Sequence, residues 1–256
     1  MAAKIIFVFS EGRTGSTMLC KLFLNYQHVI NFNEALFESG NDFFYSDINF
    51  GRFLFKKYNM FFLKELKIKL FNDPIQLLST IADYYTDDTI ILKIHLHQLD
   101  TLTEKNLDWI LSQPNHRFIL LQRANFLETY VSEFIATQSN IWHNDNTANT
   151  KIKIDIPHYI MQINLQKQWQ NKIKHDLNDH NIDTLMVEYN KDLKYYDNND
   201  FINLVDPWIK RVVLDLQLGK PPIMSSKRQN TNENIFDNIT NHEEIKELIK
   251  KDKYIM

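Results

Sequence analysis

The chain has one cysteine, no long apolar run and no large excess of either charge. Its single cysteine, Cys20, excludes an internal disulfide and a Cys-based zinc site within one chain. No stretch of the sequence approaches the roughly 20 apolar residues that a membrane-spanning helix needs. The 29 basic and 32 acidic residues leave a net charge of −3, so nothing in the balance favours nucleic acid as the main partner.

The segment MAAKIIFVFSEGR also contains too short an apolar run for a secretory signal peptide. We therefore expect a soluble cytoplasmic protein without membrane insertion. A length of 256 residues suits a single α/β domain, assigned to residues 1–256. The sequence leaves the oligomeric state open.

Short apolar runs alternate with helical patterns along the chain. The runs predict strands at residues 5–9, 90–94, 117–121 and 184–188. Helices are predicted from the glycine loop through Tyr26, at 61–70, from Pro74 through Tyr85, and at 107–111, 127–135, 158–178 and 243–251. The polar segment 138–156 predicts a long loop. This order predicts a three-layer α/β fold with a mainly parallel central sheet flanked by helices.

Ligands of parallel sheets bind beyond the carboxyl ends of the strands. The loops that follow Phe9, Ile94 and Gln122 should therefore converge on one crevice. Residues that carry chemistry are to be sought there first.

The first of these loops has the features of an anion site. A buried strand leads into the loop Ser10 to Thr17, which contains Gly12 and Gly15, and a helix follows. Glycines allow a close backbone approach, and a helix amino terminus favours negative charge. The Walker A pattern GxxxxGK[ST] is not met, because Ser16 stands in place of its lysine and Ser10 in place of its first glycine. Hydrolysis of ATP or GTP is therefore disfavoured.

The cation of this loop is Arg13, and the run GRTGST resembles the 5′-phosphosulfate loop of PAPS-dependent sulfotransferases, [RK]-[ST]-G-[ST]-[ST]. The resemblance implies a P-loop-like sulfotransferase fold and PAPS (3′-phosphoadenylyl sulfate) as the co-substrate. It also implies that the donor's 5′-phosphosulfate is held by five consecutive residues: Arg13, Thr14, Gly15, Ser16 and Thr17.

A second motif follows the third predicted strand. The pattern R-x-N-x-L-x-x-x-V-S, from Arg123 to Ser132, resembles the 3′-phosphate motif of the same family. An arginine at a strand end can present a bidentate fork to a phosphate. The resemblance assigns Arg123 and Ser132 to the 3′-phosphate. Two departures stand out: Ser132 lies one residue further on than in many members, and Ala124 replaces a second arginine found in some relatives.

Two later segments resemble the family more loosely. Residues 187–193 look like its Y-E-D-L segment, with Asn190 in place of the glutamate. The run from Ser226 to Gln229 looks like the basic loop that closes over the nucleotide, so Lys227 or Arg228 would contact the 3′-phosphate.

Sulfuryl transfer needs a cation at the leaving phosphate and a base at the acceptor. Arg13 suits the first role, because it lies in the loop that would hold the 5′-phosphate. Glu34 matches the base of bacterial-type carbohydrate sulfotransferases, whereas His95 matches the K-x-H segment of enzymes acting on phenols and steroids. In that segment Lys93 would assist the sulfuryl group. Glu34 is placed first, because the Arg123–Ser132 pattern belongs with the carbohydrate branch.

The pair His95 and His97 raises the question of a metal, since H-x-H places both side chains on one strand face. No third ligand follows from the spacing, and no metal is expected. The prediction is a PAPS-dependent sulfotransferase acting on a small-molecule or carbohydrate acceptor, such as a glycolipid, and releasing PAP. The alternatives are a nucleotide kinase or NTPase-like P-loop protein and a non-catalytic nucleotide-binding module.

Overall fold

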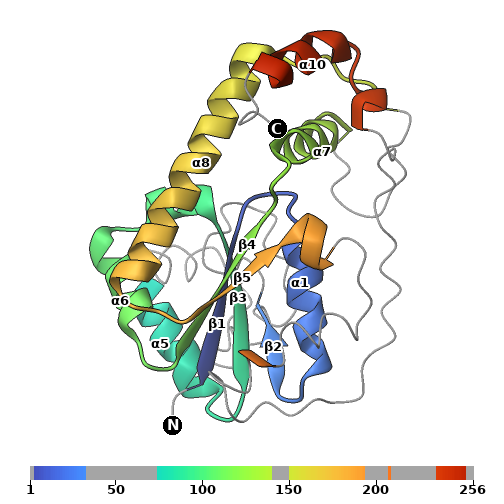
Figure 1. Cartoon of the computed structure of the whole chain (residues 1–256). Coiled ribbons are helices and arrows are strands. Elements are labelled where there is room, and N and C mark those ends of the chain that lie inside the picture. Colours follow the sequence, from blue (N-terminus) through green and yellow to red (C-terminus); the bar gives the residue numbers. More distant parts are fainter. Residues whose placement is uncertain (1–2, 33–73, 140–149, 194–206, 209–234, 252–256) are drawn as a thin grey trace, which may run out of the picture.

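The computed structural model describes residues 3–32, 74–139, 150–193, 207–208 and 235–251 (Figure 1). Within these residues one all-parallel sheet has the strand order β2-β3-β1-β4-β5. Its strands are β1 (Lys4–Ser10), β2 (Val29–Asn31), β3 (Thr89–His95), β4 (His116–Gln122) and β5 (Thr184–Glu188).

Strand β1 lies at the centre of the sheet, between β3 and β4. Its Ile5 is in register with Ile90 of β3 on one side and with His116 of β4 on the other. Every residue of β1 after Lys4 is buried, as expected of a parallel strand covered on both faces.

Helices cover both faces of the sheet, so the fold has three layers (Figure 1). Because side chains alternate along a strand, Ile6 and Val8 pack with α1 (Ser16–Leu22) on one face. Phe7 and Phe9 pack on the other face, which is covered by α5 (Pro74–Tyr84), α6 (Glu104–Ser112) and α8 (Ile156–Asp179).

A third hydrophobic cluster lies beyond the carboxyl edge of the sheet. It joins α7 (Phe126–Ser139), the amino-terminal part of α8, the short helix η4 (Ile235–Asn238) and α10 (His242–Lys251). The long helix α8 belongs to both regions, because Tyr159 packs in this cluster and Ile173 packs against the sheet. Helix α7 is thereby held above the strand ends (Figure 1).

The predicted α/β architecture with a parallel central sheet is confirmed, and so are the four predicted strands. Strand β2 escaped prediction, because its three residues, VIN, are too short for a recognisable apolar run. The helix expected to continue to Tyr26 ends at Leu22 and passes into a 3₁₀ turn, η1 (Phe23–Asn25). The helix predicted at 61–70 lies outside the described residues.

The loop predicted over 138–156 is shorter at both ends, since α7 reaches Ser139 and α8 begins at Ile156. Residues 140–149 lie outside the described part. Ile152 and Ile154, in the described remainder, are buried in the third cluster, and Ile152 bridges to Ile239. Apolar contacts therefore fix this part of the segment.

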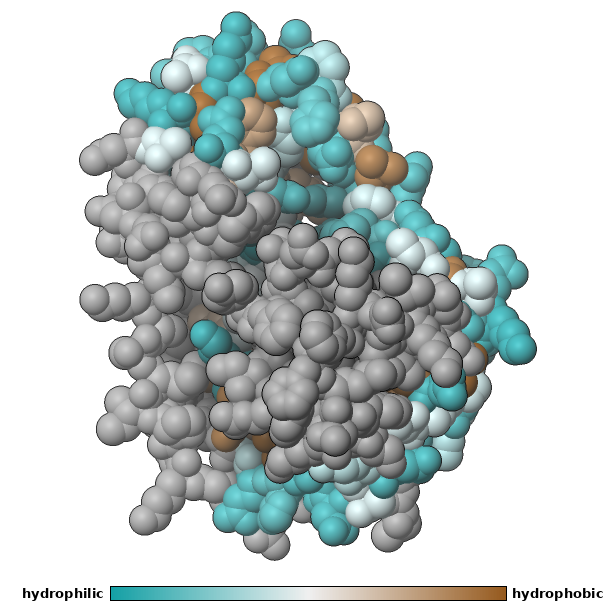
Figure 2. All heavy atoms as spheres, turned by 180° about the vertical axis from the view of Figure 1, so that it is seen from behind, coloured by the Kyte–Doolittle hydropathy of each residue, from teal (hydrophilic) through white to brown (hydrophobic). Residues whose placement is uncertain are grey.

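The described surface on the rear face is largely hydrophilic (Figure 2). Among the described residues, the exposed large apolar side chains are those of Leu24, Tyr84, Met161 and Met186. Among the described helices, none is both long and apolar enough to cross a membrane.

Candidate functional site

The loop between β1 and α1 has an unusual backbone. Gly15, directly before α1, takes a left-handed conformation with φ of 81°, and Arg13 has φ of 59°. Left-handed backbone is cheap for glycine and costly for a residue with a side chain. Because the N-cap position of α1 is a glycine, it has no side chain to cap the first turn.

The side chain of Tyr189 lies directly against Gly15. A Cβ atom built on Gly15 would lie 2.4 Å from a ring carbon of Tyr189, closer than any real contact. Tyr189 opens η3 (Tyr189–Leu193), a single π-helical turn that follows β5, and such turns are frequent at functional sites. Glycine is therefore required at position 15 for two separate reasons.

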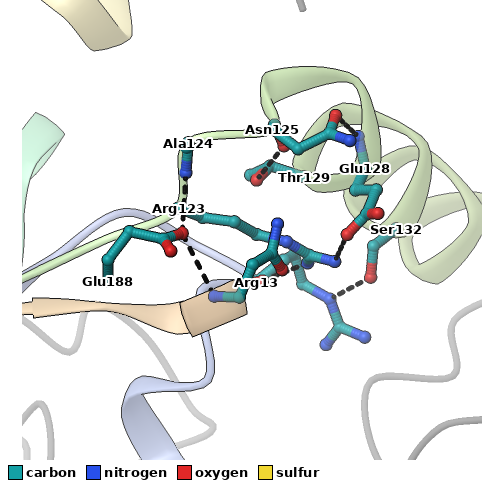
Figure 3. A network of polar contacts seen from close by, with 9 residues as sticks. Arg13, Arg123, Ala124, Asn125, Glu128, Thr129, Ser132 and Glu188 are labelled. Carbon is teal, nitrogen blue, oxygen red and sulfur yellow. Dashed lines mark hydrogen bonds and ion pairs between the residues drawn. The ribbon is translucent and has the colours of Figure 1, made fainter. Parts of the chain in front are cut away.

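Arg13 points toward helix α7 and is half-buried. Its Nε donates a hydrogen bond to Oγ of Ser132 at 3.0 Å (Figure 3). Burial lowers the pKa of Arg13, while the carboxylate of Glu133 opposes that shift. An arginine side chain is not deprotonated in proteins, so the guanidinium keeps its charge.

Arg123, at the end of β4, clamps the same loop. Its Nη1 donates to the carbonyl oxygen of Arg13 at 3.0 Å, and its Nη2 pairs with the carboxylate of Glu128 (Figure 3). Its guanidinium also lies over the ring of Tyr189, 4.8 Å from the centroid. The loop, β4, α7 and η3 are thus joined through one arginine.

Glu188, the last residue of β5, fixes the neighbouring backbone. Its Oε1 accepts from the N–H group of Ala124 at 3.3 Å (Figure 3). The same oxygen accepts from the N–H of Asn190 at 3.1 Å, and Oε2 accepts from the N–H of Lys191 at 2.8 Å. These bonds hold the β4 end and the π-helical turn together, which positions both Arg123 and Tyr189.

The third strand end contributes Lys93 and His95. Lys93 is 5% exposed, and its Nζ donates to Oγ1 of Thr17 in α1 at 3.2 Å. It reaches α1 because it alternates with Leu92 and Ile94, which face the other layer. His95 ends β3, and its backbone N–H donates to Oε1 of Gln98 at 2.8 Å.

The expectation that His95 and His97 share one strand face is wrong. Strand β3 ends at His95, and His97 belongs to the following 3₁₀ helix η2 (Leu96–Thr101), so the two do not share a strand face. Their rings nevertheless stack, with centroids 5.7 Å apart, because the tighter turn brings them together. No group of three or more metal-ligating side chains occurs in the described ranges.

The remaining loop residues have local roles. The Thr14 hydroxyl donates to the carbonyl oxygen of Glu11 at 2.7 Å, which closes the turn. Thr14 and Ser16 are both buried, at 1% and 4% exposed. Glu34, Lys227 and Arg228 lie outside the described residues.

Glu11 is a candidate site residue that the sequence reasoning missed. It follows β1 directly, is 4% exposed, and no donor in the described part of the chain reaches its Oε1. Burial raises the pKa of Glu11 to about 8, and the nearby charge of Glu133 adds to the rise. The available signal was a single carboxylate placed between a buried strand and an anion loop.

The predicted convergence of the loops after Phe9, Ile94 and Gln122 is therefore found, with Arg13, Lys93, Arg123 and Ser132 around one edge of the sheet. Ser132 contacts Arg13 rather than Arg123, which differs from a simple Arg123–Ser132 pair for one phosphate. A scan against protein-family models finds no match to this chain, and a search of curated proteins finds none either.

Proposed function

We propose that the chain is a sulfotransferase that moves a sulfuryl group from PAPS to a hydroxyl of a carbohydrate or glycolipid and releases PAP. The proposal includes the P-loop-like sulfotransferase form of the α/β fold. It rests on the resemblance of the two motifs, and the geometry of the strand ends supports it.

One observation carries the proposal. Arg13 and Arg123 belong to separate motifs 110 residues apart, yet Arg123 donates to the Arg13 carbonyl and Arg13 donates to Ser132. Both arginines follow adjacent parallel strands, so the topology brings the two motifs to one edge of the sheet. Their contact, at adjacent strands of a parallel sheet, supports one site for a ligand with two anionic groups.

In the proposed reaction the acceptor oxygen forms a bond to sulfur as the bond from sulfur to the bridging phosphate oxygen breaks. The acceptor proton passes to a base, Glu34 or His95, and the electron pair of the broken bond stays on the PAP phosphate. Arg13 neutralises that charge, and Lys93, held beside Thr17, adds a second cation.

The second motif would act on the donor's 3′-phosphate. Arg123 already pairs with Glu128, so the phosphate would share or replace that carboxylate. The Arg123 and Glu128 side chains are only 11% and 19% exposed, so a phosphate that shares Arg123 with Glu128 avoids leaving that carboxylate unpaired.

The decisive experiment measures sulfuryl transfer from labelled PAPS to a panel of sugars, glycolipids, phenols and steroids. Arg13→Ala should lower kcat/KM by about 100-fold or more, because a cation at the developing charge is lost. Arg117→Ala is the matched control, since Arg117 lies at the opposite end of β4, and it should keep the wild-type rate. Unchanged transfer by Arg13→Ala would refute the proposed mechanism.

The same panel separates the two bases. Sugar acceptors and a rate loss in Glu34→Gln would favour Glu34, whereas phenolic acceptors and a rate loss in His95→Asn would favour His95. If neither substitution slows transfer, both base assignments are wrong.

The kinase or NTPase alternative draws on one observation. Lys93 brings an ammonium group to the Thr17 hydroxyl from a neighbouring strand, so the loop has a lysine despite Ser16. Binding and hydrolysis of ATP, without binding of PAP, would favour that alternative. Binding of PAP without transfer to any acceptor would favour a non-catalytic module.

A further inference from the structure

The carboxyl end of β1 holds polar atoms that the described protein leaves unsatisfied. Ser10 Oγ, Glu11 Oε1 and, at the end of adjacent β4, Gln122 Nε2 are buried without a hydrogen-bond partner among the described residues. Such atoms are rare in folded proteins, because each costs the free energy of its desolvation. Three of them on neighbouring strands, beside the candidate anion loop, call for a functional explanation.

Glu11 is the unexpected member of this group. An ionised carboxylate in a loop that binds a phosphate would repel its ligand. Glu11 is nearly fully buried and has the carboxylate of Glu133 nearby, and both conditions disfavour its charged form.

Other charged or titratable groups surround the loop on several elements. They are Arg13 in the loop, Glu133 from α7, Arg123 from the β4 end, Tyr189 from η3, and Lys93 and His95 from β3. The cations among them are already engaged: Arg13 with Ser132, Arg123 with Glu128, and Lys93 with Thr17. The acid that acts on the Glu11 carboxyl is Glu133, which has the same charge.

We propose that an anionic ligand enters this loop together with one proton, which the buried Glu11 carboxyl holds. The inference rests on the proposed function, since it concerns the donor's phosphate. A protonated carboxyl removes a negative charge from the loop and gains a donor, whereas an ionised one offers acceptors only. The ligand's charge and the Glu11 proton then favour each other reciprocally, as linkage requires.

The pH range follows from the free protein. Burial and Glu133 raise the pKa of Glu11 to about 8. Below this pH the Glu11 carboxyl already holds the proton, so the affinity for PAP does not change with pH. Above this pH the carboxylate must take up a proton each time PAP binds. The phosphates of PAP are fully ionised in this range, because their second pKa is about 6. Affinity for PAP should therefore fall about tenfold between pH 7 and pH 9.

The test is calorimetric titration of PAP into the full chain at pH 7 and at pH 9. Titrations at pH 8.5 in two buffers of different ionisation enthalpy measure the number of protons taken up. Wild type should take up about 0.8 proton per PAP at pH 8.5. Glu11→Gln keeps the shape and the donor without titrating. Its affinity ratio between the two pH values should be under about twofold, with no proton uptake. Glu247→Gln, an exposed single-charge control on α10, should behave as wild type.

Glu133→Gln is a second, independent variant. Removing that carboxylate lowers the pKa of Glu11, so the onset of weaker binding should move to lower pH. If the pH at which PAP binding begins to weaken is the same in Glu133→Gln as in wild type, the inference is contradicted even if Glu11→Gln fails to fold. If wild type binds PAP equally well at pH 7 and pH 9, the inference is wrong and the proposed function is unaffected. The same holds if Glu11→Gln keeps the wild-type ratio of affinities between these pH values. Absence of PAP binding at both pH values would overturn the proposed function with it.

Discussion

The two ends of the central strands differ in how their polar groups are satisfied. At the amino end, Asn115 Nδ2 donates to the Ala3 carbonyl at 2.6 Å, and His116 Nδ1 lies 2.7 Å from the Ile110 carbonyl as its donor. Phe7 and Trp109 enclose the His116 ring. At the carboxyl end, Ser10 and Glu11 have buried oxygens that no described donor reaches.

The difference indicates a division of labour along each strand. The amino end is built for stability, because its buried polar groups are paired and packed among aromatic rings. The carboxyl end stores unfavourable terms: an unsatisfied acid, the left-handed Arg13 and arginines held close together. Strain and unsatisfied groups of this kind cluster where a protein binds or reacts.

The largest predicted effect is on stability at high pH. Because the folded protein holds the Glu11 proton more tightly than the unfolded chain does, the free energy of unfolding falls as pH rises from about 4.5 to about 8. Glu11→Gln removes this loss. The free energy of unfolding of the variant, relative to that of wild type, should therefore rise by up to about 5 kcal/mol across that range, at 1.36 kcal/mol per pKa unit.

Denaturant unfolding of both proteins at a series of pH values measures this difference in the free energy of unfolding. If the difference stays constant with pH, Glu11 is ionised in the folded protein as in the unfolded chain. The proposed contrast between the two strand ends would then be lost.

The next effect concerns the amino end and has the opposite sign. Burial lowers the pKa of His116 from 6.5 to about 4. The unfolded chain therefore binds this proton more readily, and the free energy of unfolding falls as pH drops from about 6.5 to about 4, by up to about 3 kcal/mol. His116→Gln should flatten this part of the pH profile. An unchanged acid limb in the variant would show that another group sets it.

The smallest of the three effects compares two glycines of one loop. Gly15→Ala would place a Cβ 2.4 Å from Tyr189 at φ of 81°, and should cost about 2 kcal/mol of unfolding free energy and abolish PAP binding. Gly12→Ala is the matched control, because its Cβ would meet only Glu133 oxygens at 4.0 Å. It should stay within about 0.5 kcal/mol of wild type. Equal melting temperatures for the two variants would contradict the assigned role of Gly15.

Local sequence patterns were sufficient to predict the sheet but not all of its edge. Apolar runs such as IIFVF identify strands, because burial on both faces leaves no place for polar residues. The glycine loop and the Arg123 segment were found in the same way, since each has a short local pattern. β2 was missed, because three residues cannot show a period.

The missing parts of the site are those set by distant contacts. Tyr189 closes on Gly15 across 174 positions of sequence, and nothing in the local residues indicates this contact. The charge of Glu133 acts on Glu11 from α7, whose position is fixed by packing against α8 and α10. The same helix places Ser132 on Arg13 instead of on Arg123. Tertiary packing decided these contacts.

The central position of β1 also affects how the chain is made. β1 pairs on both sides with strands that come much later, and its second neighbour, β4, begins only at His116. At a synthesis rate of about 5–20 residues per second, the apolar run of β1 waits on the order of ten seconds for that neighbour. During this interval the segment IIFVF has the composition of an aggregation-prone window. This interval is therefore the stage at which the apolar run of the nascent chain is most exposed to aggregation.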